Sequence, residues 1–242
     1  MRATAPRGVL IAGGGTAGHV LPGLAIAEAL VDRGVVDDRS GVHLVGSRRG
    51  IEVDLVPPTG FGLTVLPGRG IQRRLTPANL VAVVGLSYGF LRALVLMVRR
   101  RPAVVVSLGG YASVPCALAA AVLRVPVVVA EQNAVPGAAN RLAGRFARAC
   151  AVSFAGTDLP RSALTGNPVR RAIRALAESG DRVGDRSEAR ASLGIGDRPF
   201  VVVFGGSLGA RRINRALVRS VEDWTGGPVV IEHVVGPRGW SR

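Results

Sequence analysis

The chain has 242 residues, 48% of them hydrophobic and 4% aromatic, a length that suits one large domain or two small ones. Its 31 lysine and arginine residues, all of them arginine, against 16 acidic residues give a formal net charge of +15. Such a charge attracts phosphate-bearing substrates and anionic lipid surfaces, although a compositional bias of the genome is an alternative source of it. The scarcity of aromatic side chains argues against a stacking platform, so no nucleic-acid partner is expected.

The first apolar run is followed by a glycine-rich loop and then by a helical pattern. Residues 9–12 predict a strand, Gly13–Gly18 form the loop, His19 follows, and apolar spacing after Pro22 predicts a helix over 24–33. The N–H groups at a helix N-terminus attract anions, and glycine lets the backbone approach a ligand closely. The segment therefore predicts an anion-binding loop beside a histidine that can move a proton near neutral pH.

Short apolar runs alternate with helical patterns through the first two thirds of the chain. Continuous apolar strands that alternate with helices are typical of a parallel sheet covered on both faces. We therefore predict a Rossmann-like, doubly wound α/β domain over residues 1–168, with ligands at the carboxyl ends of its strands. Strands are expected at 9–12, 42–45, 63–66, 104–107, 127–130 and 151–154, and helices at 24–33, 80–99, 115–123 and 138–148.

The composition changes after Gly166-Asn167-Pro168. Residues 169–198 are mostly charged and contain no strand-like run, so they are expected to be a linker. A second strand, glycine loop and helix then follow, at Phe200–Phe204, Gly205–Gly209 and from Arg211. Because only 43 residues run from Phe200 to Arg242, we expect residues 199–242 to be an incomplete second Rossmann-like domain and the chain to be truncated.

The apolar segment Leu80–Val98 is long enough to raise the question of a transmembrane helix. Its 19 residues carry one charge, Arg92. However, Gly85, Tyr88, Arg92 and Arg99 fall along one helical stripe, and a strand of the predicted sheet follows directly. We therefore predict a helix that packs on the sheet rather than one that spans a membrane.

The first loop also matches the dinucleotide-binding pattern Gly-x-Gly-x-x-Gly through Gly13, Gly15 and Gly18. In that case an acidic residue should follow the second strand, but the sequence there reads Gly46-Ser47-Arg48-Arg49. Because Arg48 and Arg49 could bind the 2′-phosphate of NADP, an NADP-binding oxidoreductase remains an alternative. No His, Cys and Asp cluster has the spacing of metal ligands and no Walker-type loop occurs, so no metal or other cofactor is expected.

Five motifs in order resemble the MurG family of N-acetylglucosaminyltransferases, which convert lipid I to lipid II in peptidoglycan synthesis. The motifs are Gly14-Gly15-Thr16-Ala17-Gly18-His19-Val20-x-Pro22-Gly23, Gly109-Gly110-Tyr111-Ala112-Ser113-x-Pro115, Glu131-Gln132-Asn133, Gly166-Asn167-Pro168-Val169-Arg170 and Gly205-Gly206-Ser207-Leu208-Gly209-Ala210. The resemblance implies a GT-B fold, with two Rossmann-like domains and the active site in the cleft between them.

The resemblance also implies roles for individual residues. His19 is expected to be the catalytic base, although a capping or packed histidine is the alternative. Glu131 is equally suited to proton transfer and to an N-cap or ion pair, and Tyr111 to the acceptor site and to packing. His43 and His233 are expected to be structural. The donor-binding candidates are Thr16, Ala17, Gly18, Asn133, Arg170 and Ser207, and the acceptor-side candidates are Gly14, Gly15, Tyr111 and Glu131.

The implied reaction is transfer of N-acetylglucosamine from UDP-GlcNAc to the 4-hydroxyl of an undecaprenyl-linked muramyl-pentapeptide, with inversion and without a metal. The basic, apolar region Ile71–Leu86, including Arg73, Arg74, Leu75, Leu80 and Val84, is expected to lie on the anionic cytoplasmic face of the cell membrane as a peripheral contact. Because much of the donor domain is expected to be missing, we predict a weak or inactive transferase. A non-catalytic membrane-binding fragment is the remaining alternative.

Overall fold

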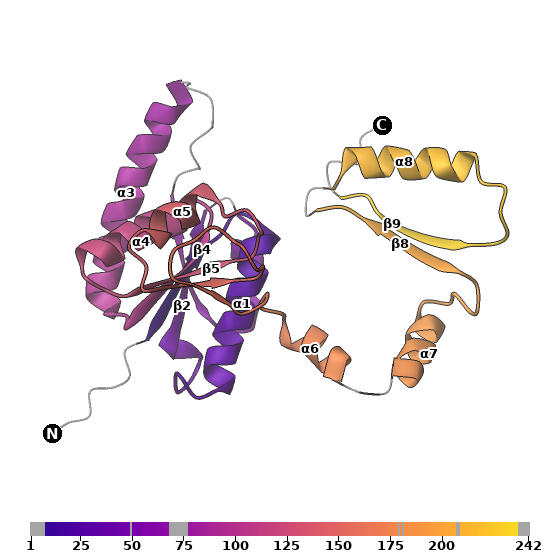
Figure 1. Ribbon diagram of the computed structural model, residues 1–242, viewed down its shortest axis with the longest axis horizontal. Coiled ribbons are helices and arrows are strands. Elements are labelled where there is room, and N and C mark those ends of the chain that lie inside the picture. Colours follow the sequence, from indigo (N-terminus) through magenta and orange to yellow (C-terminus); the bar gives the residue numbers. More distant parts are fainter. Residues whose placement is uncertain are drawn as a thin grey trace. The chain divides into compact units, whose positions relative to one another are not determined.

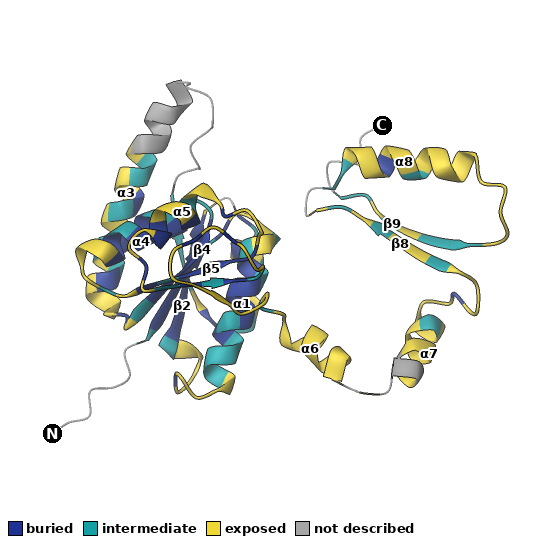
Figure 2. Ribbon diagram, in the orientation of Figure 1, coloured by how far each residue is buried: buried dark blue, intermediate teal, exposed yellow. Residues whose placement is uncertain are grey.

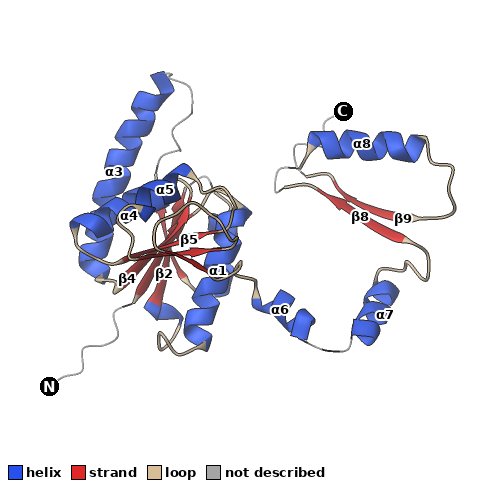
Figure 3. Cartoon of the chain, in the orientation of Figure 1, coloured by secondary structure: helices blue, strands red, loops and turns tan. Residues whose placement is uncertain are grey.

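The computed structural model describes residues 8–48, 50–67, 77–178, 180, 182–206 and 209–236, without the side chains of 77–83, 182–183 and 185. The chain divides into two compact units, Met1–Arg174 and Ala175–Arg242. Each unit is an α/β arrangement of helices and parallel strands (Figures 1 and 3).

The first unit contains a seven-stranded parallel sheet in the order β3-β2-β1-β4-β5-β6-β7. This order is that of a Rossmann-type sheet, in which the chain starts at the centre and winds outward in both directions. The strands are β1 (Val9–Gly13), β2 (Val42–Ser47), β3 (Gly62–Leu66), β4 (Val104–Gly109), β5 (Val127–Glu131), β6 (Ala149–Val152) and β7 (Ser162–Leu164). The helices are α1 (Ala17–Asp32), α2 (Glu52–Leu55), α3 (Pro77–Arg100), α4 (Ser113–Val122) and α5 (Ala138–Gly144), with 3₁₀ turns η1 (Arg39–Gly41) and η2 (Pro57–Thr59).

The two faces of this sheet carry separate hydrophobic cores. Along β1, Leu10 and Ala12 belong to the core shared with α3, α4 and α5, whereas Val9 and Ile11 belong to the core shared with α1. Successive side chains of a strand point to opposite faces, so a strand covered on both sides must be apolar throughout. The central strands are accordingly buried along almost their whole length (Figure 2), and the predicted doubly wound sheet is confirmed.

The helix after the first glycine loop begins earlier than its sequence predicts. The expected start was Leu24, after Pro22, but α1 begins at Ala17, with Thr16 in an extended conformation at the N-cap and Pro22 inside the helix. Proline lacks one N–H group, and near a helix N-terminus few turns precede the ring to clash with it. Gly18 and His19 therefore lie in the first helical turn rather than in a loop.

The outer part of the sheet also differs from its prediction. The strand expected at 151–154 lies at Ala149–Val152, because this register pairs it with β5 and leaves the half-exposed Phe154 in the following turn. Helix α5 ends at Gly144 instead of residue 148, and Arg148 donates its N–H to the carbonyl of Val127 at the start of β5. The short edge strand β7 is fully exposed, so it has no apolar pattern to predict it.

Helix α3 packs on the first unit, as predicted. Ala93 and Met97 are buried in the core shared with α4, and Phe90, Leu94 and Leu96 pack against it. Within the described part of the chain, no helix combines the length and the apolar character required to cross a bilayer. Of the residues expected on a membrane surface, 71–76 lie outside the described residues, as does the side chain of Leu80, while Val84 is exposed.

The second unit consists of two parallel strands and their helices. Strands β8 (Phe200–Phe204) and β9 (Val230–Val234) pair in parallel, and helix α8 (Arg211–Glu222) connects them. The region expected to be a linker contains α6 (Arg171–Glu178) and α7 (Arg182–Ser192). The strand at 200–204 and the helix from Arg211 are thus confirmed.

Candidate functional site

The candidate site lies where the chain order of the central strands reverses. From β1 the chain proceeds outward to β2 and β3, and then returns to β4 on the other side of β1. Loops that follow neighbouring strands diverge at such a point and leave a crevice at the carboxyl ends. Gly13 at the end of β1 pairs with Gly109 at the end of β4, so both glycine loops begin here.

The first loop leads directly into the N-terminus of α1. The Oγ1 of Thr16, the N-cap residue, lies 3.2 Å from Nδ1 of His19. The N–H groups of His19 and Val20 both reach the carbonyl of Thr16, at 3.1 Å. The N–H groups of Ala17 and Gly18 precede any possible intrahelical acceptor, so they are available at the positive end of the helix dipole.

The second loop passes close to the first and to His19. Gly109 and Gly110 have φ values of +92° and +79°, which favour glycine. A Cβ on Gly110 would collide with the carbonyl oxygen of Gly14, and one on Gly109 would lie 3.3 Å from Nε2 of His19. The two loops therefore bring the His19 ring against the end of β4, and a side chain at either glycine would separate them.

The electrostatic environment of His19 favours its neutral form. Burial lowers the pKa of the imidazole below its usual 6.5, while the charge of Glu131, a hydrogen bond with the Gly14 backbone and the charge of Glu52 oppose part of that shift. A neutral imidazole has one ring nitrogen free to accept a proton. At neutral pH the side chain is therefore in the state that a general base requires.

Glu131 is the centre of a hydrogen-bond network at the end of β5. One carboxylate oxygen accepts the N–H and the side-chain amide of Asn133 at 2.9 and 2.8 Å, and the other accepts the N–H of Gly137 and the amide of Asn140, both at 3.0 Å. Burial alone would raise the pKa of this carboxyl, but these bonds lower it below its usual value. Asn140 is itself buried and accepts a bond from the Ser107 hydroxyl at 3.1 Å.

A cavity of about 530 Å³ opens between these groups. Of the predicted site residues, His19, Tyr111, Glu131 and Asn133 all line it, so the fold brings together residues that are up to 114 positions apart (19 to 133). Apolar side chains from α3, α4 and α5 form much of the rest of the wall. The remaining lining residues are Leu86, Gly109, Gly110, Val114, Gly137, Ala138, Ala139, Asn140 and Leu142.

Tyr111 contributes its ring to this cavity, but its hydroxyl is directed to the backbone. The hydroxyl oxygen lies 2.8 Å from the carbonyl oxygens of both Pro67 and Gly85. Burial raises the pKa of the phenol, so it remains a hydrogen-bond donor. Tyr111 therefore connects the end of β3 to α3 at the edge of the cavity.

Arg170, a predicted donor-binding residue, does not line this cavity. Arg170 is exposed, and its carbonyl accepts the N–H groups of Ile173 and Arg174 at the start of α6. The neighbouring Arg171 forms an ion pair of 3.8 Å with Asp32 at the end of α1. Ser207 lies outside the described residues. The structure therefore groups His19, Tyr111, Glu131 and Asn133 around one cavity, which Arg170 does not line.

Glu52 is a buried residue of the site that its sequence did not single out. Its carboxylate accepts the N–H of Gly15 in the first glycine loop, at 3.0 and 3.2 Å, and the N–H of Ser47 at the end of β2. The side chain is 1% exposed. The one signal for it is a glutamate at the start of a short helix, close to Gly46 and Gly50.

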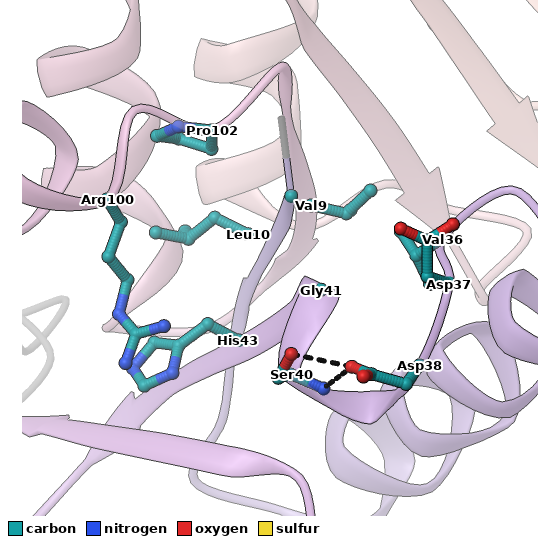
Figure 4. Close-up of a pocket in the computed structure, with 11 residues that line it drawn as sticks. Val9, Leu10, Val36, Asp37, Asp38, Ser40, Gly41, His43, Arg100 and Pro102 are labelled. Atoms are coloured by element: carbon teal, nitrogen blue, oxygen red, sulfur yellow. Dashed lines mark hydrogen bonds between the residues drawn. The ribbon is translucent and has the colours of Figure 1, made fainter. Parts of the chain in front are cut away.

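A second cavity, of about 380 Å³, lies at the amino-terminal ends of β1 and β2. Figure 4 shows residues that line it. It contains His43 beside Arg100 from the end of α3, and Asp38, which accepts hydrogen bonds from Ser40. His43 is buried and its Nε2 lies 2.8 Å from the Thr64 hydroxyl, which agrees with the predicted packing role. Among the described residues, no group of three or more His, Cys, Asp or Glu side chains is placed to hold a metal ion.

Comparison with known sequences identifies the family of the first unit. A model of the glycosyltransferase family 28 N-terminal domain matches residues 9–152. A relative from Acidothermus cellulolyticus, named UDP-N-acetylglucosamine–N-acetylmuramyl-(pentapeptide) pyrophosphoryl-undecaprenol N-acetylglucosamine transferase, is 44% identical over 236 residues, which are 95% of this chain and 61% of the relative. A relative of the same name from Streptomyces coelicolor is 41% identical over 233 residues, 95% of this chain and 62% of the relative. The chain thus spans about three fifths of the length of these relatives.

Solved structures agree with this assignment. MurG from Acinetobacter baumannii has a TM-score of 0.67 and 25% identity over 97% of this chain and 62% of its own. UDP-GlcNAc 2-epimerase from Neisseria meningitidis, with a TM-score of 0.59 and 12% identity over 92% of this chain and 64% of its own, shares the fold. The predicted GT-B class is confirmed, and no support is found for the NADP-binding oxidoreductase. The chain belongs to glycosyltransferase family 28, with residues 9–152 as its N-terminal domain.

Proposed function

We propose that the protein transfers N-acetylglucosamine from UDP-GlcNAc to the 4-hydroxyl of undecaprenyl-pyrophosphoryl-MurNAc-pentapeptide, with inversion and without a metal. The proposal rests on the position of a neutral His19 between two glycine loops. It also rests on the relatives of this chain, which bear the name of this transferase. In this proposal residues 1–168 form the acceptor and membrane-side domain, 169–198 a linker, and 199–242 the start of the donor domain.

His19 is the general base in this proposal. It removes the proton of the acceptor hydroxyl as that oxygen attacks the anomeric carbon and the UDP leaves. Its lowered pKa and its place in the cavity wall support this role. In this proposal the Nδ1–H of His19 donates to Thr16 Oγ1, 3.2 Å away, and Nε2, on the side of Gly109, is then unprotonated and able to accept the proton.

The charged phosphates are bound by backbone and arginine in this proposal. The N–H groups of Ala17 and Gly18, with the Thr16 hydroxyl, face the phosphate groups at the positive end of α1. Arg170, whose side chain is exposed, and Ser207 are the further donor-binding candidates of this proposal. Asn133 binds a sugar hydroxyl of the donor, because its side-chain amide can both donate and accept hydrogen bonds.

The acceptor lies along the cavity wall in this proposal. The acceptor-side candidates in this proposal include Gly14, Gly15 and Tyr111, whose ring lines the cavity. Glu131 organises the wall rather than moving a proton, because both of its carboxylate oxygens already accept two N–H groups each.

The direct test measures transfer of radiolabelled GlcNAc to a short-chain lipid-linked acceptor. Any turnover by this chain should fall by about a hundredfold or more in His19→Gln, the range that removal of a general base causes. Binding provides the readout if turnover is absent: UDP-GlcNAc or the acceptor should shift the NMR signals of His19 and Gly18, and NADPH should not. Full turnover in His19→Gln, or NADPH binding at the loop, would refute the proposal.

We also propose that the chain attaches peripherally to the anionic cytoplasmic leaflet of the cell membrane through α3. The part of this helix whose side chains are described, residues 84–100, exposes five large apolar or aromatic side chains at spacings of four and three residues: Val84, Tyr88, Leu91, Val95 and Val98. Arg92, Arg99 and Arg100 lie on the same helix, which contains no acidic residue. An apolar stripe flanked by arginine suits insertion at a negatively charged lipid surface.

Vesicle flotation tests the attachment. The chain should float with vesicles that contain phosphatidylglycerol and less so with neutral vesicles or at high salt. Leu91→Ser should reduce the floating fraction, whereas Leu164→Ser, at a similarly exposed leucine of β7, should not. Equal flotation of the two variants would exclude α3 as the contact.

A further inference from the structure

The first glycine loop already contains an anion that belongs to the chain itself. Glu52 lies at the start of the four-residue helix α2, and its carboxylate accepts the N–H of Gly15 with both oxygens, at 3.0 and 3.2 Å. The same carboxylate accepts the N–H of Ser47. Glu52 is 1% exposed, whereas Gly15 is exposed, so the carboxylate is the buried partner of these bonds.

The surrounding backbone is shaped to hold this carboxylate. A Cβ on Gly14, Gly46 or Gly50 would collide with the Glu52 side chain. The three glycines belong to the first loop, to β2 and to the turn before α2, so three separate segments leave space for one side chain. A chance contact between Glu52 and the first loop would not need a glycine in each of these three segments.

The burial of this charge is balanced by backbone dipoles. A buried carboxylate is costly unless hydrogen bonds replace its water. Here the N–H groups of Gly15 and Ser47 supply that replacement. In dinucleotide-binding domains, a ligand pyrophosphate uses the same kind of loop and helix N-terminus.

We propose that Glu52 is a positioning and specificity residue that takes the place of a ligand phosphate at Gly15. It fixes the first loop, on which His19 depends, and it repels any phosphate from the Gly15 N–H. Substrate phosphate is then confined to the N–H groups of Ala17 and Gly18. This role in substrate placement rests on the proposed function, whereas the Glu52–Gly15 contact does not. It also explains why a loop that matches the dinucleotide pattern would reject a dinucleotide.

The ligand-free chain provides the first test. In an NMR spectrum, the Gly15 amide should exchange with solvent at least about tenfold faster in Glu52→Ala than in the unmodified chain, because alanine offers no side-chain acceptor for its N–H. The His19 pKa should fall as well, since Glu52 is one of the charges that raise it; Glu131 is the other, and Gly14, Thr16, Gly109 and Asn140 are its uncharged neighbours. Asp54→Asn, the matched control, removes the same charge from an exposed position of α2 and should change neither.

A second variant separates the carboxylate's position from its charge. Gly50→Ala should displace the carboxylate and speed Gly15 exchange with Glu52 still charged, whereas Gly227→Ala, where a Cβ meets nothing within 4 Å, should not. If either Glu52→Ala or Gly50→Ala folds but leaves Gly15 exchange unchanged, the proposal is wrong.

Titration with inorganic phosphate tests the exclusion of ligand. Phosphate should move the amide signals of Ala17 and Gly18 and leave Gly15 unmoved, and Glu52→Ala should add Gly15 to the responding set. A Gly15 response in the unmodified chain would overturn the proposal. Absence of any response at Ala17 and Gly18 would instead count against the proposed phosphate site. The rate of Gly15 exchange would then still decide whether Glu52 holds the first loop.

Discussion

His43 makes the stability of the first unit depend on pH in a way that can be calculated. Burial, together with the positive charge of Arg100, lowers the pKa of His43 to about 4, against 6.5 for an unperturbed histidine. Between these two values the unfolded chain binds a proton that the folded chain does not. The free energy of unfolding therefore falls as the pH falls through this window.

The size of the effect follows from the gap between the two pKa values. At about 1.4 kcal/mol per pH unit, a gap from 6.5 to about 4 corresponds to about 3 kcal/mol. The contribution is complete above pH 7 and absent below about pH 4. Because it is a sizeable part of the stability of a typical domain, acidification should noticeably weaken this unit.

The assay is urea unfolding at several pH values between 7.5 and 4, followed by NMR signals of the buried valines in β1 and β2. His43→Gln can keep a hydrogen bond to Thr64 but does not titrate. Between pH 7.5 and 4, the free energy of unfolding of this variant should therefore fall by about 3 kcal/mol less than that of the unmodified chain. Other titrating groups cancel in this difference. His233→Gln, in β9 of the second unit, is the control and should leave the first unit's pH dependence unchanged. Equal pH dependence in His43→Gln and the unmodified chain would refute the reasoning.

Two further predictions concern packing and the site. Met97→Ala should destabilise the first unit by about 2–4 kcal/mol in urea, because the side chain is buried in the core beneath α3, whereas the adjacent exposed Val98→Ala should cost less than about 0.5 kcal/mol. Glu131→Gln should lower the His19 pKa more than Glu52→Gln does, because the charge of Glu131 raises this pKa more than the charge of Glu52 does. Glu28→Gln on α1 is the control. NMR titration of the histidine Cε1–H signals measures the His19 pKa in all three variants.

The sequence predicted the parts of the fold whose patterns are local. Strands buried on both faces are continuous apolar runs, so the strands at 9–12, 42–45 and 104–107 were found to within two residues. The misplaced boundaries reflect information that is not local. The start of α1 depends on tolerance of Pro22 within the helix, and the position of β6 depends on its register with β5.

The candidate site divides in the same way. His19 and the glycine loops are evident in the sequence because a strand, a glycine loop and a helix form a recognisable unit. Glu52 is not, because its function depends on a four-residue helix that turns its side chain back 37 positions to Gly15. Nothing in the spacing of an isolated glutamate indicates that it will face a loop so distant in the chain.

Among the described residues, the titratable side chains that line the cavity of about 530 Å³ leave one group suited to accept a proton. Tyr111 has a raised pKa and its hydroxyl lies against two backbone carbonyls, and Glu131 has a lowered pKa with both oxygens occupied by N–H donors. His19, whose pKa lies below 6.5, is neutral at physiological pH and is the remaining titratable group of that wall. If it is the base, kcat/KM for glycosyl transfer should decline on acidification with a midpoint below pH 6.5, because this ratio reports the pKa of the free enzyme. A midpoint above 6.5 would contradict that assignment, since burial, the largest influence on the ring, acts in the opposite direction.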